Sequence, residues 1–347
     1  MKWCELIVFV FLQPILCSFG IITNALTIVV LKNNNNVEKM KDTMYKHIFI
    51  NSIFNILYCM LILVKEINIC IFDLSPFCSP VYQAKASQYF QLYGLFFFGN
   101  AIKLCCNISY ISFSLSRFLL STNKHPKTYR KLERLNIKAY YFIIFCASIL
   151  LSIFKIFEYQ INEIYLPSKS YPFKIYDAGS CEAGSVYCTL FRVFNIINDF
   201  IKDVLFFFTN LIIDILLFRT SQKNVKHKKK ILNDMIKIDI AIKFKNKMNR
   251  MVFLNGVLFF IAYFPEFITN ITLIVFDKKI NLFCYQNISC SVLNEFAQFF
   301  ILKKFNKTFN KSFNDFKSNL LNKFKFKITT KKSSNKDVSI QNVPSDQ

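Results

Sequence analysis

The amino-acid sequence is organised around long blocks that are apolar nearly all round, unlike the helices of soluble proteins, which have an apolar face and a polar face. Six blocks lie at about 6–31, 48–64, 89–120, 139–157, 193–218 and 251–276. A weaker seventh at about 283–302 includes the polar residues Gln286, Asn294, Glu295 and Gln298. The first block is too long for a signal peptide, so we expect it to be retained. Since about 20 helical residues cross the ~30 Å hydrocarbon core, we predict an all-α membrane protein, a seven-transmembrane helix bundle.

The positive charge of the chain indicates how this bundle is oriented. With the N-terminus outside, the inner segments hold 32 of the 44 Lys and Arg residues, and the outer segments hold seven. Cytoplasmic loops of membrane proteins are enriched in Lys and Arg. The distribution therefore predicts the N-terminus outside and the C-terminus inside. The net charge of +23 is then a coat on the inner face, and no nucleic-acid partner is expected in a chain that is 53% hydrophobic.

Cysteines select the same topology, because disulfides form on the oxidising side of a membrane. None of the chain's twelve cysteines lies in a predicted inner loop, and six lie in the outer loops: Cys70, Cys78, Cys181, Cys188, Cys284 and Cys290. We expect one disulfide bond from Cys70 or Cys78 to Cys181 or Cys188, and a local bridge between Cys284 and Cys290. Six cysteines allow 15 pairings, and buried free thiols are the alternative.

Short motifs recur in the predicted spans in a fixed order. They are Gly20-Ile-Ile-Thr-Asn24, Asn51-Ser-Ile-Phe-Asn55, Leu115-Ser116-Arg117-Phe118, Ala262-Tyr263-Phe264-Pro265, Asn294-Glu-Phe-Ala-Gln298 and, after the last span, Phe305. Together these motifs resemble those of rhodopsin-like (class A) G-protein-coupled receptors over about residues 5–317. A serine replaces the acid before Arg117, and the seventh span lacks the family's proline and tyrosine. These departures are typical of a divergent invertebrate-type receptor, peptide-receptor-like or chemosensory.

The resemblance implies a switch near the inner membrane face. Arg117 and Phe118 match the triplet whose arginine meets the G protein when the sixth helix moves outward. Pro265 removes a backbone hydrogen bond and should kink that helix beside Tyr263. The alternatives are a snorkelling arginine at a helix end and ordinary packing of the aromatic residue.

Three asparagines, Asn24, Asn55 and Asn294, lie in the first, second and seventh spans. Amide side chains form hydrogen bonds between membrane helices. We expect the three asparagines to form a shared polar core with a functional role, and simple helix packing is the alternative.

Several charged residues share one depth in the membrane. Lys103, Asp203 and Glu266 lie ~21–24 Å from the inner ends of their spans, and Asp199 lies about one turn further out. Charges inside a bilayer are costly and face the bundle interior in pairs. Since the third, fifth and sixth spans line the ligand cavity of the resembled family, we predict that these four residues bind the ligand. A structural network of ion pairs is the alternative.

The cytoplasmic side ends in a short amphipathic eighth helix, predicted over 303–325 after the bundle at 1–302, with a disordered tail at 326–347. Its phenylalanines recur every three or four residues and lysines fill the other face, which suits the anionic lipids of the inner leaflet.

These features predict a receptor in the plasma membrane that transduces an extracellular ligand, a peptide or a small zwitterionic molecule, to a heterotrimeric G protein. No enzyme motif, metal site or cofactor site is found in the sequence. The alternative function is a membrane transporter or channel that uses Lys103, Asp203 and Glu266.

Overall fold

A computed structural model describes residues 11–32, 43–67, 84–122, 136–167, 172–180, 200–231, 299–304 and 309–319, with a few single positions between them. This part of the chain is almost entirely helical. Four of its helices are long and apolar enough to cross a membrane, as in an all-α membrane protein, and they coincide with the first four predicted spans.

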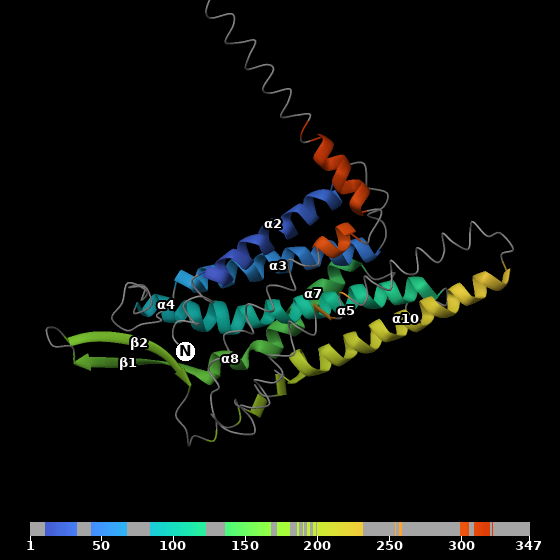
Figure 1. Ribbon diagram of the computed structural model, residues 1–347. Helices are drawn as coiled ribbons and strands as arrows, with labels where there is room; N and C mark the ends of the chain where they lie inside the picture. The colour runs from blue at the N-terminus through green and yellow to red at the C-terminus, as the bar shows by residue number, and fades with distance from the viewer. Residues whose placement is uncertain are drawn as a thin grey trace, which may run out of the picture.

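The helices follow one another in chain order (Figure 1). The first two are α2, Gln13–Lys32, and α3, Thr43–Ile67. Three elements then run on without a break: α4, Lys85–Tyr89, the π-type turns of η5, Phe90–Gly99, and α5, Asn100–Thr122. The fourth candidate span consists of α7, Ile137–Ser152, and α8, Phe154–Glu158. The predicted fifth span falls on η6, Phe200–Leu205, and α10, Phe206–Ile231.

Local hydrogen bonds allow polar residues to lie in these apolar helices. In α2, the hydroxyl groups of Ser18, Thr23 and Thr27 each donate to the carbonyl oxygen four residues earlier, at 2.8–2.9 Å. At the start of α7, the Asn136 side chain accepts a bond of 3.1 Å from the Lys138 amide and caps the helix. These four side chains therefore have hydrogen-bond partners that do not require water.

α5 lies at the centre of the bundle and contacts α3, α7 and α10 (Figure 1). Its contact with α7 is lined by small polar residues. The Cys105 thiol donates to the Ser148 hydroxyl at 3.3 Å, and the hydroxyls of Ser112 and Tyr140 are 2.9 Å apart. Small side chains let membrane helices approach closely, and Ser148 and Ser152, both fully buried, do so on α7.

The second predicted outer loop contains a feature that the sequence analysis did not predict. Strands β1, Tyr159–Pro167, and β2, Pro172–Ser180, form an antiparallel hairpin that pairs Tyr159 with Ser180. Figure 1 shows it projecting from the end of the bundle where α8 stops. We call this the hairpin end, and the opposite end, where α2 and α5 stop, the basic end.

The fifth predicted span was expected to end at Phe218, but α10 continues to Ile231. Those thirteen further residues extend the helix by about 20 Å beyond the apolar stretch. The sixth and seventh predicted spans lie almost wholly outside the described residues.

Residues 299–304 and 309–319 are helical at the basic end. Phe309 is buried in a core that includes Val30 and Leu31 of α2 and Ile48 of α3. Phe313 packs against the same core, with the Lys303 ammonium 4.5 Å above its ring centroid. The apolar face of the predicted eighth helix therefore contacts protein here, where the sequence analysis expected lipid. The predicted tail lies outside the described residues.

All six cysteines of the predicted disulfides also lie outside the described residues. Five other cysteines are described, and among them the structure forms no disulfide: Cys17, Cys59, Cys105, Cys106 and Cys146.

The contact between α5 and α7 can be tested with Ser148→Leu. The larger side chain has no space against Cys105, and overpacking of this kind typically costs about 1–3 kcal/mol. We expect a lower melting temperature of the detergent-solubilised protein. Ala147→Leu is the matched control, because the neighbouring Ala147 is exposed. Equal melting temperatures for the two variants would contradict this packing.

Candidate functional site

One face of α5 is polar along most of its length. Asn100, Lys103, Asn107, Tyr110 and Ser114 follow one another at alternating intervals of three and four residues, which places them on one side of the helix. Asn100 is half-buried, and the other four are at least nine-tenths buried. Lipid-facing positions do not hold such residues, so this face points into the protein.

The segment predicted as the fifth span has a second polar face. Asn198, Lys202, Asn210 and Asp214 lie at intervals of four or eight residues, and each is at least nine-tenths buried. η6 and α10 run beside α5, as Figure 1 shows. A buried lysine and a buried aspartate on one helix face require polar surroundings.

Hydrogen bonds join the two polar faces. The Lys202 ammonium donates to Asn100 Oδ1 at 3.3 Å, and Asn107 Nδ2 donates to the Lys202 carbonyl oxygen at 3.3 Å. Asn100 Nδ2 also donates to the Ser152 hydroxyl at 3.0 Å. The Asn100 amide thus connects α5, α7 and η6 in the half of the bundle nearer the hairpin end. We call Asn100, Lys103, Ser152, Asn198 and Lys202 the polar cluster.

Only part of the predicted ligand site can be located. Lys103 is buried on the polar face of α5. Asp203 belongs to η6, next to Lys202, while Asp199 and Glu266 lie outside the described residues. Lys202, Asn100, Asn198 and Asp214 were not among the residues that the sequence analysis predicted for the ligand site. The spacing of polar residues on α5 and α10 was the signal that could have found them.

The predicted switch residues are also only partly described. Arg117 and Phe118 lie in the last two turns of α5, at the basic end, and Phe118 is half-buried. Tyr263, Pro265 and Asn294 lie outside the described residues.

Two of the three predicted asparagines are brought together. Asn55 Nδ2 donates to Asn24 Oδ1 at 3.3 Å, and Asn24 Nδ2 donates to the Gly20 carbonyl oxygen at 2.8 Å. Both side chains are buried between α2 and α3. The first and last residues of the first motif, Gly20 and Asn24, therefore contact each other within α2.

A second polar group lies at the basic end around His47, near the start of α3. The structure buries His47, and its Nδ1 is 2.6 Å from the Tyr141 hydroxyl of α7. The rings of Tyr140 and Tyr141 both meet the imidazole edge-on. In the described part of the chain, no group of three His, Cys, Asp or Glu side chains is arranged to hold a metal ion.

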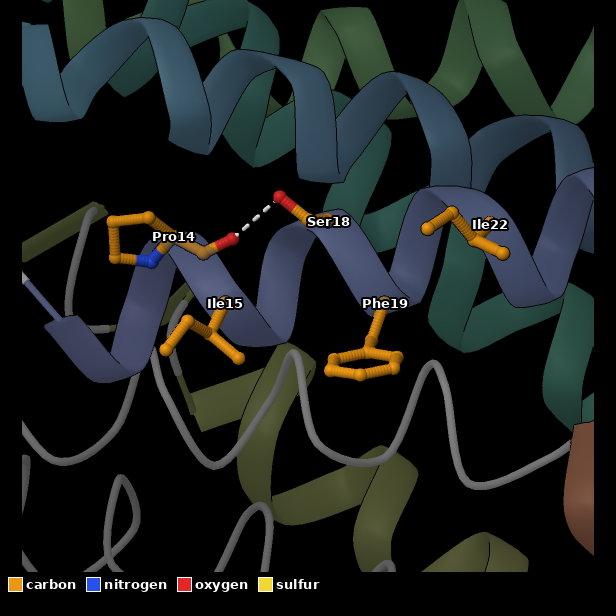
Figure 2. A pocket seen from close by; sticks show the side chains of 5 residues that line it. All are labelled: Pro14, Ile15, Ser18, Phe19 and Ile22. Carbon is orange, nitrogen blue, oxygen red and sulfur yellow. Dashed lines mark hydrogen bonds between the residues drawn. The ribbon is translucent and has the colours of Figure 1, made fainter.

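A hollow on the surface of α2 is a poor match for a polar ligand (Figure 2). The described residues that line it are Pro14, Ile15, Ser18, Phe19 and Ile22, all on α2. The only hydrogen bond drawn among them joins Ser18 to the Pro14 carbonyl oxygen. This apolar surface suits lipid chains, so the polar cluster is the stronger candidate site.

No protein-family model and no curated protein matches the chain. The function is therefore inferred from the residues of the chain alone.

The contact between Asn24 and Asn55 can be measured with a double-mutant cycle of Asn24→Ala and Asn55→Ala. Hydrogen bonds between membrane helices have coupling energies of about 0.6–1.7 kcal/mol. We expect a coupling in this range for the free energy of unfolding in mixed micelles. Ser18→Ala combined with Asn55→Ala is the control, because Ser18 bonds only within its own helix. Additive effects of the two asparagine substitutions would contradict the contact.

Proposed function

We propose that this protein is a seven-helix receptor of rhodopsin-like type in the plasma membrane, with its hairpin end outside the cell, that couples an extracellular ligand to a heterotrimeric G protein. The observation that carries the proposal is the polar cluster. It holds two buried ammonium groups and three buried or half-buried side-chain amide or hydroxyl groups between three helices.

The cluster suits a ligand that has a carboxylate group. Lys103 and Lys202 supply positive charge, and Asn198 has a buried Nδ2 that makes no hydrogen bond to described residues. Two acids, Asp203 at the predicted depth of Lys103 and Asp199 about one turn further out, would meet a cationic group of the same ligand. A peptide or a small zwitterionic molecule has both groups.

Signalling in this proposal is a population shift. The ligand favours one arrangement of the third, fifth and sixth helices, and the same arrangement opens the basic end for the G protein. Lys103 and Arg117 are fourteen residues apart on α5, or ~21 Å along the helix. The central helix thus reaches from the ligand to the cytoplasmic partner, while lysines at the basic end contact anionic lipids.

The experiment is a nucleotide-exchange assay with heterotrimeric G proteins, run on membranes that contain the full chain against a panel of peptides and zwitterionic small molecules. Loss of one charged hydrogen bond costs about 1.5–3 kcal/mol. We therefore expect Lys103→Ala, Lys202→Ala and Glu266→Ala each to reduce ligand potency by about tenfold or more at unchanged surface expression.

Lys85→Ala is the matched control, because Lys85 is exposed on α4 at the hairpin end. Unchanged dose–response curves for both Lys103→Ala and Glu266→Ala would show that these residues do not form the ligand site.

A second candidate function, a transporter or channel that uses Lys103, Asp203 and Glu266, is favoured by one observation. The polar faces of α5 and α10 continue past the cluster to Ser114 and Asp214. Ion flux into proteoliposomes without nucleotide exchange would select this function over the receptor.

A further inference from the structure

The polar faces of α5 and α10 end in opposite charges. Arg117 comes three residues after the last member of the polar face of α5 and continues its alternation of three and four residues. Asp214 is the last member of the polar face on α10. The two faces are in contact at Asn107 and Lys202. The arginine and the aspartate therefore belong to the sides of the two helices that face each other.

The two residues also lie at one depth. Both helices run from the hairpin end toward the basic end (Figure 1). From the hydrogen bond between Asn107 and Lys202, Arg117 lies ten residues further along α5, ~15 Å, and Asp214 lies twelve residues further along the fifth helix, ~18 Å. The difference of ~3 Å is well within the reach of an arginine side chain.

Asp214 lies on the protein side of α10. Its side chain is 7% exposed, whereas Ile212 and Leu216, on the opposite side of the helix, are 55% and 41% exposed. A carboxylate buried in this way requires a cation and hydrogen-bond donors. On α5, the helix that α10 contacts, lysine and arginine occur only at Lys103 and Arg117. Lys103 lies fourteen residues nearer the hairpin end, so Arg117 is the cation at the depth of the aspartate.

Asn210, one turn before Asp214 on α10, offers a second acceptor. It is 1% exposed, and its Oδ1 accepts no hydrogen bond from a described residue. A guanidinium group has five N–H donors in a planar fork, so it can bond to a carboxylate and to an amide oxygen at the same time. The two acceptors on α10 are thus suited to an arginine.

We propose that Asp214 and Arg117 form a buried ion pair, supported by Asn210, that joins α5 to α10 near the basic end and favours the resting state of the receptor. This deepens the proposed function and rests on it. The acid that the sequence lacks beside Arg117 is then supplied by another helix. Because the partners belong to different helices, the pair breaks when the basic ends of α5 and α10 separate, and its strength biases that equilibrium.

The ion pair is tested by exchanging its charges in the full chain, with the melting temperature in detergent as the readout. Asp214→Arg and Arg117→Asp each place like charges together, and we expect each to lower the melting temperature by about 5–10 °C. The double variant restores opposite charges and should recover most of this loss. Arg219→Asp combined with Asp214→Arg is the control, because Arg219 is exposed on α10 and should give no recovery.

The effect on the resting state is tested by nucleotide exchange without ligand. Asp214→Asn keeps the shape of the side chain and removes its charge, and we expect basal exchange to rise about three- to tenfold. Asp315→Asn is the matched control, because Asp315 is a half-buried acid at the basic end that belongs to neither α5 nor α10. Its basal exchange should be unchanged.

Three results would each overturn the proposal. They are a double variant that recovers no stability, a recovery obtained by exchanging Asp214 with Arg250 of the predicted sixth span instead, and unchanged basal exchange of Asp214→Asn in a chain that responds to ligand. Recovery of stability without nucleotide exchange by any variant or ligand would contradict the proposed function and support the ion pair. The two failures are therefore distinguishable.

Discussion

A polar side chain inside a bilayer has no water to bind, so each polar group on these helices needs a partner within the protein. The arrangement of the bundle follows from how α5 meets this requirement. Asn100 bonds to Ser152 of α7 and to Lys202 of η6, Cys105 bonds to Ser148, and Ser112 to Tyr140. These contacts fix the depth and rotation of the helices around α5, while the apolar residues fill the space between them.

The same contacts make the candidate site part of the scaffold. Asn100 accepts from the Lys202 ammonium with one atom of its amide and donates to α7 with the other. A ligand group that competes for either bond therefore acts on the contact between two helices as well as on one side chain. In the proposed receptor, one amide would link ligand binding to helix position, which is the physical requirement for a site that reports its occupancy at a distance.

Hydrophobicity predicted the first four spans because the ~30 Å thickness of the bilayer core determines how long an apolar block must be to cross it as a helix. It could not predict the end of α10 at Ile231, since apolar residues mark the end of the membrane and not the end of the helix. The hairpin was missed because Tyr159–Pro167 is short and alternates polar and apolar residues only in part. Comparing the membrane depths of charged residues identified Lys103. It missed Asn100, because an uncharged amide is common enough in a span that it was not selected.

The unbroken helix from η6 to Ile231 has a mechanical consequence. Lys202 and Ile231 are 29 residues apart, so the segment between them is about 44 Å long. A rigid rod of that length converts a tilt of roughly 5° at Lys202 into a displacement of about 4 Å at its far tip. A small movement of this helix at the polar cluster is therefore amplified at its far end, which carries the basic residues that follow Phe218.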